Sequence, residues 1–473
     1  MNHSEFLSKP KSMLIAPAGH GKTHLITECL LHAEGRQLVL THTHAGIASI
    51  AEKIRKAKIP LSKFHIETIT GYAQKYLQAY YKGADVPGLD DPNHYAFAIE
   101  QAKRIIASPL VGKVIKATYS GLFVDEYQDC TLSQHQLVDA LAIMLPTRIF
   151  GDPLQGIFNF GDTAMSNLED AGQMGDFYHN SYKLEEPWRW KNINEPLGKQ
   201  LKEIRADIEG KRDVDIRKYP AIQFIKIDSE SDIYNPQTQY YQKVNRILSE
   251  KNVLIIHPES SSIEPRKRVI SNFKIPITLV EAIDDKDFYN LAKLFDAMQD
   301  GAVEIGLYAA CMALFSKTEL NKWINFKGAV ARTKEWKEAS QEIRKMYLFA
   351  KEAGQKYLGC SLLLRHFLSI KGVRCHRKEL LNSLCAALEE AFINKNTAYD
   401  SMVEKRNRVR KMGRKVSGRC IGTTLLTKGL EFETVIILNV NKFTSPKNLY
   451  VALTRASKKL VVFGVSPIIS PKY

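Results

Sequence analysis

A glycine-rich segment near the start of the chain has the residue types that bind a nucleotide triphosphate. Residues 16–23 read APAGHGKT and follow the short apolar run 13–15. Glycines let the backbone turn so that its N–H groups cradle phosphate oxygens at the start of the next helix. In such a loop Lys22 supplies a charge to the β- and γ-phosphates, and Thr23 a hydroxyl to Mg²⁺. We therefore expect nucleotide contacts from Ala18, Gly19, His20, Gly21, Lys22, Thr23 and His24.

A later acidic segment supplies the other half of this chemistry. Residues 125–129 read DEYQD and follow the apolar run 121–124. Asp125 is placed to hold the metal with Thr23, and Glu126 to accept a proton from the attacking water. Either segment alone is also explained by a glycine turn or an acidic strand end. Found together and in this order, they predict an NTPase.

The composition points to a polyanionic partner. The 473 residues carry a net charge of +16, with 44% hydrophobic and 25% charged residues. Such an excess attracts nucleic acid, and charge alone does not distinguish DNA from RNA. The alternative is a basic surface that only keeps the protein soluble. No apolar run approaches the roughly twenty residues that span a bilayer, so we expect no membrane partner.

The cysteines and the first residues favour a cytoplasmic protein. Seven scattered cysteines without a Cys-x-x-Cys pair are typical of free thiols in a reducing compartment. The N-terminal stretch lacks the charged start and apolar core of a signal peptide. One cluster is a candidate for zinc, although helical core cysteines explain it better because its spacing is wrong; its members are Cys360, His366, Cys375, His376 and Cys385.

Apolar runs alternate with helical patterns at both ends of the chain, which predicts an α/β fold with two parallel sheets. The predicted strands of the first sheet are 13–15, 37–41, 121–124 and 148–150, and those of the second are 222–227, 253–257, 277–281, 434–440 and 460–465. Two mainly helical stretches, 73–117 and 284–415, interrupt these sets. The second stretch ends in the basic run 404–411, which fits either a solvated helix face or a contact with phosphate backbone.

Further motifs add arginines and aromatic rings to the expected site. Residues 151–155 read GDPLQ, and Gln155 is placed to read the γ-phosphate. Phe158 and Phe160 follow and would stack on unpaired bases, unless they belong to the core. Arg189 lies in PWRW and Arg455 in YVALTRA. Each arginine would neutralise charge developing on the γ-phosphate, unless it forms a surface salt bridge.

This series of motifs resembles the UvrD/Rep/PcrA family of superfamily 1 DNA helicases over nearly the whole chain. The resemblance assigns Arg189 and Arg455 as arginine fingers, and Glu431, in KGLEF with Gly429, as the contact to the ribose. It also implies contacts to single-stranded DNA from a set of polar and aromatic residues, which are Thr41, Thr43, His44, Thr68, Thr70, Phe158, Phe160 and Thr423.

The resemblance implies two RecA-like P-loop lobes, each carrying a helical insertion. The first lobe is expected at 1–72 and 118–190 with its insertion at 73–117, and the second at 191–283 and 416–473 with its insertion at 284–415. ATP and Mg²⁺ would bind between the lobes. The chain would then translocate 3′ to 5′ along single-stranded DNA or tailed duplex DNA.

The compact size suggests a second interpretation. Short UvrD-like chains resemble the helicase subunit of antiphage systems such as Gabija, whose partner is a nuclease of the OLD family. The biological role would then be DNA repair or antiphage defence. The alternative function is a regulatory subunit that senses DNA and nucleotide and gates a partner nuclease without productive unwinding.

Overall fold

The computed structural model describes residues 3–88, 91, 93–158, 163–258, 261–282, 286–330, 337–412 and 416–473. The chain divides into two compact units, Met1–Glu230 with Thr427–Tyr473, and Ser231–Leu426. Within the described ranges, no helix combines the length and the apolarity needed to cross a bilayer.

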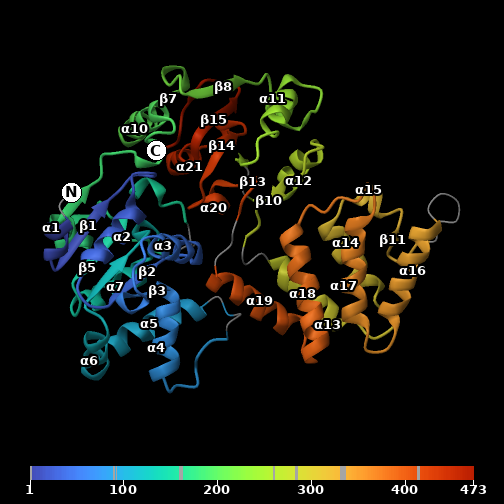
Figure 1. Cartoon of the computed structure of the whole chain (residues 1–473), viewed down its shortest axis with the longest axis horizontal. Coiled ribbons are helices and arrows are strands. Elements are labelled where there is room, and N and C mark those ends of the chain that lie inside the picture. The colour runs from blue at the N-terminus through green and yellow to red at the C-terminus, as the bar shows by residue number, and fades with distance from the viewer. Residues whose placement is uncertain are drawn as a thin grey trace. The chain divides into compact units, whose positions relative to one another are not determined.

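The first sheet is parallel, has six strands and lies wholly within the first unit (Figure 1). Its register is continuous, with Met13 opposite Ile149 and Leu40 opposite Val124. In sheet order the strands are β3 (Phe64–Thr68), β2 (Gln37–Thr41), β4 (Gly121–Val124), β5 (Thr147–Gly151), β1 (Lys11–Ile15) and β6 (Ser181–Lys183).

Alternation along the central strands builds a separate hydrophobic core on each face of this sheet. Leu122 and Val124 pack into the core that α4, α5 and α7 share, whereas Phe123 between them packs into the core of α2 and α3. Successive side chains of a strand point to opposite faces, so a continuous apolar run is what a sheet covered on both sides requires. This layering places the carboxyl ends of the strands at one edge, where the polar motifs follow.

The four strands predicted for this sheet are confirmed, and two strands were missed. β3 and β6 form the two edges and read FHIET and SYK. Neither sequence is an apolar run, because an edge strand has only one neighbour and its side chains stay partly exposed. Short polar strands of this kind carry no periodic signal in the sequence.

The helices of the first unit connect and cover these strands. α4 to α6 occupy the stretch predicted as the first helical insertion and pack on the core beneath the sheet. The helices are α1 (His3–Ser8), α2 (Lys22–His32), α3 (His44–Lys56), α4 (Ile69–Tyr80), α5 (His94–Ile106), α6 (Pro109–Thr118), α7 (Leu132–Ala142), α8 (Ala171–Met174), α9 (Asp176–His179), α10 (Glu195–Glu209) and α21 (Pro446–Leu453).

A second six-stranded parallel sheet confirms the predicted fold class. Its five predicted strands are present, and β13 is an addition that the sequence pattern did not reveal. In sheet order the strands are β10 (Thr278–Leu279), β13 (Arg419–Gly422), β9 (Val253–Ile256), β14 (Phe432–Ile437), β15 (Ala456–Gly464) and β8 (Ile222–Lys226). Two antiparallel pairs stand apart from both sheets, namely β7 (Val214–Asp215) with β16 (Ile468–Ile469) and β11 (Ile324–Asn325) with β12 (Gly328–Ala329).

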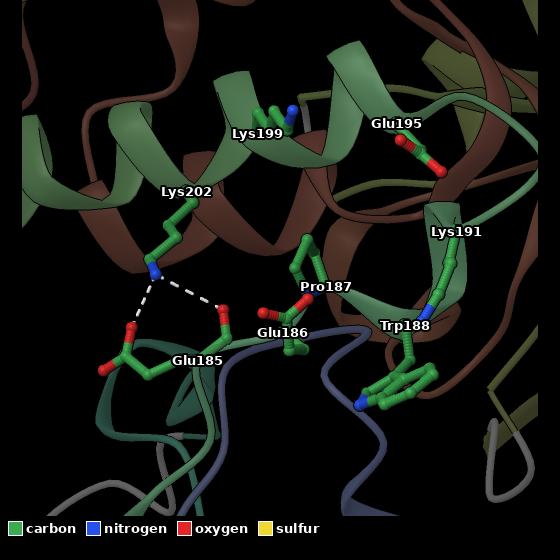
Figure 2. Close-up of a pocket in the computed structure, with 8 residues that line it drawn as sticks. All are labelled: Glu185, Glu186, Pro187, Trp188, Lys191, Glu195, Lys199 and Lys202. Carbon is green, nitrogen blue, oxygen red and sulfur yellow. Dashed lines mark hydrogen bonds and ion pairs between the residues drawn. The ribbon is translucent and has the colours of Figure 1, made fainter.

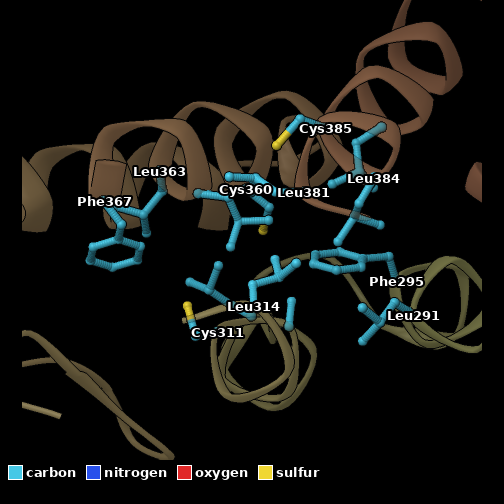
Figure 3. Packing of buried hydrophobic residues seen from close by; sticks show 14 of the residues in the cluster. Leu291, Phe295, Cys311, Leu314, Cys360, Leu363, Phe367, Leu381, Leu384 and Cys385 are labelled. Atoms are coloured by element: carbon cyan, nitrogen blue, oxygen red, sulfur yellow. The ribbon is translucent and has the colours of Figure 1, made fainter. Parts of the chain in front are cut away.

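Most of the second unit is a helical bundle with its own core (Figure 3). Leu291 and Phe295 of α13, Leu314 of α14 and Leu384 of α18 meet there. This bundle occupies the stretch predicted as the second helical insertion. The unit's helices are α11 (Gln239–Ile247), α12 (Glu264–Ser271), α13 (Lys286–Ala297), α14 (Glu304–Leu314), α15 (Lys317–Leu320), α16 (Lys337–Lys351), α17 (Lys356–His366), α18 (Lys378–Asn394) and α19 (Ala398–Met412).

Candidate active site

The glycine-rich segment forms the turn between β1 and α2. Lys22 is the first residue of α2, so the free N–H groups of the helix start border the loop. Gly19 has a φ of +74° and Gly21 a φ of +92°, which is the left-handed region that favours glycine. Ala16 is fully buried beneath the turn, where a small side chain fits.

Two carboxylates from the end of β4 hold the Lys22 ammonium. Its Nζ lies 2.6 Å from Glu126 and 3.3 Å from Asp125, and the Lys22 side chain is 9% exposed. Burial opposes the charged form, but Asp125 and Glu126 outweigh it and raise the pKa of Lys22. Burial likewise opposes ionisation of Glu126, yet Lys22 and Lys428 lower the pKa of Glu126 to about 2. Glu126 is therefore an ionised base at neutral pH.

The donor set here suits Mg²⁺ with a phosphate ligand. Magnesium prefers hard oxygen ligands and is usually held by one or two carboxylates together with substrate phosphates. Asp125 is a buried carboxylate that already stabilises a positive charge, the Lys22 ammonium, and Thr23 follows Lys22 in the first turn of α2. Gln128 donates its side-chain N–H to Glu126 and so fixes the orientation of the expected base.

The PWRW segment packs against the glycine-rich loop. A Cβ at Gly19 would lie 2.5 Å from Cζ3 of Trp190, and one at Gly21 would lie 3.3 Å from Trp188. Trp190 is 1% exposed and donates its indole N–H to the carbonyl of Ala456 at 2.8 Å. The backbone N–H of Arg189 bonds to the carbonyl of Gly19 at 2.9 Å. The loop can approach these indoles only because it carries glycine.

Both predicted finger arginines lie at this site in the first unit. Arg189 donates to the carbonyl of Thr454 at 2.5 Å, and its Nε lies 2.8 Å from Glu431. Arg455 is 2% exposed, so it is not a surface salt bridge. Its Nη2 lies 3.4 Å from Oε1 of Gln155. Both guanidinium groups contact Thr454, since Arg455 also donates to its hydroxyl at 3.1 Å. Burial, and next the charge of Arg189, lower the pKa of Arg455 to about 10.

A buried lysine connects the acidic segment to the predicted stacking aromatic. Lys428 Nζ lies 2.6 Å from Oδ1 of Asp129 and 2.5 Å from the carbonyl oxygen of Gln155. The same ammonium lies 4.7 Å from the ring centre of Phe158. The ring of His42 is 5.4 Å from that of Phe158. The partly buried Phe158 therefore has a cation and an imidazole as neighbours, and the cation also contacts the residue expected to read the γ-phosphate.

The threonines predicted to contact DNA lie mainly at the carboxyl ends of β2 and β3. Thr43 caps α3 by accepting the N–H of Gly46 at 3.1 Å, and Thr68 caps α4 by accepting the N–H of Gly71 at 2.9 Å. Capping explains the residue type and leaves each hydroxyl proton free to donate. The remaining members behave differently: Thr41 is buried, Thr70 accepts from Gln134 at 3.5 Å, and Thr423, in the second unit, accepts the N–H of Leu426 at 3.3 Å. Phe160 and the side chain of His44 lie outside the described residues.

Four other residues predicted to contact the nucleotide differ in their exposure and in the protein atoms that they contact. The side chain of His24 is 71% exposed, whereas His20 is buried and its Nδ1 contacts the carbonyl oxygen of Ala18 at 2.9 Å. Gly429 has a φ of +79° with open space around it. The N–H of Ala18 bonds instead to Asp152 at 3.1 Å and to the hydroxyl of Tyr450 at 3.2 Å. Two protein oxygens therefore share this amide, and its contact with phosphate stays a prediction.

Burial describes two clusters that the sequence left open. Cys360 and Cys385 belong to the core of the helical bundle, and the partly buried Cys375 packs against it. Across the described residues, no group of three or more His, Cys, Asp or Glu side chains is arranged to hold a metal ion. In the basic run, Arg406 is fully buried against Glu379. Neither a solvated face nor a phosphate contact describes that residue, and positions 410–415 lie outside the described side chains.

A pocket of about 300 Å³ opens beside the loop and the PWRW segment (Figure 2). The exposed face of Trp188, which is 53% exposed, borders it. Lysines of α10 line the opposite side, and Lys202 pairs with Glu185 at 2.5 Å. The pocket therefore offers an aromatic ring close to the loop expected to bind phosphate, with the Lys191 ammonium 4.1 Å from the ring centre. Sequence analysis did not predict this surface, although an aromatic residue beside the finger arginine was the available signal.

The sequence also matches known protein families at both ends. Residues 3–161 match an AAA domain, and residues 421–463 match a UvrD-like helicase C-terminal domain. A stretch of 103 residues, 21% of this chain, is 29% identical to an ATP-dependent helicase/nuclease subunit from Alkaliphilus metalliredigens (strain QYMF) and covers 8% of that protein.

A solved structure of an arterivirus nonstructural protein 10, a helicase in complex with DNA, is 11% identical and aligns with a TM-score of 0.33, covering 97% of this chain and 63% of that one. The chain thus spans less than two thirds of either relative. The two family matches, with the loop, the acidic segment and the two sheets, support the similarity of this chain to UvrD-like superfamily 1 helicases.

Proposed function

We propose that this chain is an ATP-driven motor that translocates along single-stranded DNA in the 3′-to-5′ direction and unwinds tailed duplexes. The observation that carries the proposal is the ion-paired group of buried Lys22, buried Asp125 and partly buried Glu126, in which the end of β4 meets the glycine-rich loop. Gln155 and Arg455 support it, because their side chains approach each other within the same unit. Together these residues form a site for hydrolysing a phosphoanhydride.

Each residue would act on ATP in a definite way. The amides of the loop and Lys22 would hold the phosphates, while Thr23 and Asp125 would hold Mg²⁺. Mg²⁺, when bound, supplies a Lewis acid that neutralises phosphate charge. Glu126, whose carboxylate is ionised, orients the attacking water and accepts its proton. Arg189 and Arg455 stabilise the negative charge that develops on the transferred phosphoryl group.

The nucleobase would bind on Trp188. Its indole is exposed at the pocket and lies beside Gly21 of the loop. An exposed aromatic face stacks on any base, and the charged lysines and glutamates around it supply polar contacts. Glu431 is half-exposed next to Arg189 and would accept a hydrogen bond from the ribose.

Phe158 would couple the binding of DNA to the hydrolysis of ATP. Its ring lies against Lys428, which also holds the carbonyl oxygen of Gln155 and the carboxylate of Asp129. A base stacked on Phe158 would therefore be linked to the γ-phosphate reader by one side chain. The net charge of +16 supplies the long-range attraction to the phosphate backbone.

Strand displacement on tailed duplexes tests this proposal. The purified chain, with ATP and Mg²⁺, is expected to release the shorter strand from a duplex with a 3′ single-stranded tail and not from one with a 5′ tail. Lys22→Ala serves as the inactive control, because it removes the phosphate-binding charge. Equal release from both substrates would contradict the polarity, and release by Lys22→Ala would contradict the assigned site.

A second candidate is a subunit that senses DNA and nucleotide and gates a partner nuclease, in DNA repair or antiphage defence. The name of the Alkaliphilus relative, a helicase/nuclease subunit, favours a nuclease partner. DNA-dependent ATP turnover without strand displacement by the isolated chain, followed by cleavage of DNA once co-purifying proteins are added, would support this candidate. Robust unwinding by the isolated chain would exclude it.

A further inference from the structure

Asp152 is a fully buried carboxylate with partners from several segments of the first unit. Its Oδ2 accepts the N–H of Ala18 at 3.1 Å and the side-chain N–H of Gln155 at 2.9 Å. Its Oδ1 accepts from Nη1 of Arg205 at 2.7 Å. One carboxylate thus orients both the glycine-rich loop and the side chain expected to read the γ-phosphate.

Arg205 and Tyr450 complete this arrangement from two helices, α10 and α21. Arg205 is 7% exposed, and its Nη1 also donates to the hydroxyl of Tyr450 at 3.0 Å. The guanidinium lies 5.2 Å from the ring centre of Tyr450. That hydroxyl accepts a second bond, from the N–H of Ala18 at 3.2 Å. Both acceptors of the Ala18 amide are therefore held by the same arginine.

The same carboxylate residue is tied to the expected base by a short chain of bonds. The backbone N–H of Asp152 donates to Oε1 of Gln128 at 3.0 Å, and the other end of that amide donates to Glu126. A buried carboxylate without its cation protonates or turns away, since an unpaired charge is costly in a low dielectric. Loss of Arg205 would thus disturb the positions of Gln155 and of the loop indirectly, through Asp152.

We propose that Arg205 and Tyr450 are positioning residues for ATP hydrolysis, which hold Asp152 so that Gln155 and the loop are aligned with the bound triphosphate. The inference rests on the proposed ATPase function. Neither residue is among the expected nucleotide contacts. Their effect is expected chiefly on the chemical step, because they align Gln155 through Asp152, whereas the Lys22 charge that binds the triphosphate stays in place.

The first test is a kinetic cycle of Arg205→Met, Gln155→Ala and the double variant, measured as DNA-stimulated ATP turnover. Arg205→Met is expected to lower kcat about 10- to 100-fold with little change in KM, as misplacement of a reacting group does, and Arg205→Lys is expected to restore part of it. Gln155→Ala should then have less than about a twofold further effect in the Arg205→Met background. The control is Arg217→Met, which removes an exposed Arg–Asp pair of similar length.

If Gln155→Ala lowers kcat by the same factor in both backgrounds, the positioning role is wrong. Absence of turnover in the wild-type chain would instead contradict the proposed function, so a second measurement is independent of activity. Hydrogen–deuterium exchange of peptides covering 16–23 and 152–158 is expected to rise in Arg205→Met and, to a smaller extent, in Tyr450→Phe, but not in Arg217→Met. Unchanged exchange in both peptides of folded Arg205→Met would overturn the inference.

Discussion

The contact between Gly19 and Trp190 can be tested by a single added methyl group. In Gly19→Ala the new Cβ would lie 2.5 Å and 2.7 Å from two ring carbons of Trp190. That indole cannot easily move, because it is 1% exposed and hydrogen-bonded to the carbonyl of Ala456. Gly19 also has a φ of +74°, a conformation that alanine adopts at a cost.

Two separate contributions set the size of the effect. The left-handed backbone costs an L-residue about 1–2 kcal/mol, and an overpacked core costs about 1–3 kcal/mol. Gly19→Ala is therefore expected to destabilise the folded chain by about 2–5 kcal/mol. Gly418→Ala isolates the first contribution, because Gly418 has a φ of +84° and nothing within 4 Å of its added Cβ. We expect a loss of about 1–2 kcal/mol in that control.

The assay is denaturant unfolding of the variants, with affinity for a fluorescent ATP analogue as a second readout. Trp190→Phe removes the clashing part of the indole, so Gly19→Ala should cost less in that background, by about 1–3 kcal/mol. Affinity for the analogue should fall in Gly19→Ala and remain unchanged in Gly418→Ala. If Gly19→Ala destabilises the wild-type chain and the Trp190→Phe variant equally, or if the losses at Gly19 and Gly418 are equal, the close packing of loop and indole is refuted.

Three further outcomes follow from the described contacts. Glu126→Gln should lower ATP turnover by about 10²–10⁴-fold while nucleotide binding is retained, as measured by single-turnover hydrolysis and equilibrium titration. Burial, and then the charge of Lys428, lower the pKa of His42 to about 4 in the folded chain. In the unfolded chain the pKa of His42 is about 6.5, so the unfolded chain binds this proton at a higher pH. Stability should therefore fall as the pH falls from about 6.5 to 4, by up to about 2–3 kcal/mol, and His42→Asn should remove that part of the pH dependence in unfolding titrations. Arg406→Met should destabilise the second unit by about 3–5 kcal/mol because it removes the buried cation that faces Glu379, whereas Arg408→Met, on the same helix and 57% exposed at its side chain, should cost about 1 kcal/mol or less in thermal unfolding.

The positions of the expected catalytic residues were predictable because each lies in the segment that follows an apolar strand. Lys22 comes after β1 and Asp125 after β4, and the carboxyl ends of parallel strands meet at one edge of a sheet. The same reasoning placed Gln155 after β5. The apolar runs that indicated these strands are the ones buried on both faces, so the hydrophobic pattern and the functional positions were specified together.

Residues whose partners are distant in sequence were not predictable. Arg205 lies on a helix of mostly polar residues, where an arginine is normally solvated, and only the fold brings it to Asp152. Arg406 lies in a basic run, where an arginine is also normally solvated, yet it is buried against Glu379 of another helix. Tyr450 was visible within its motif, but its contact with the Ala18 amide depends on how α21 packs. Such contacts depend on tertiary structure and have no local sequence signal.

The claim on which the account depends is that the ion-paired Lys22–Asp125–Glu126 group hydrolyses ATP under the control of DNA. The most direct measurement is the rate of ATP hydrolysis by the nuclease-free purified chain, titrated with single-stranded DNA, alongside Glu126→Gln. We predict a saturable increase in the wild-type rate and no hydrolysis above background in the variant. A wild-type rate that is the same at every DNA concentration, or a Glu126→Gln chain as active as the wild type, would contradict the account.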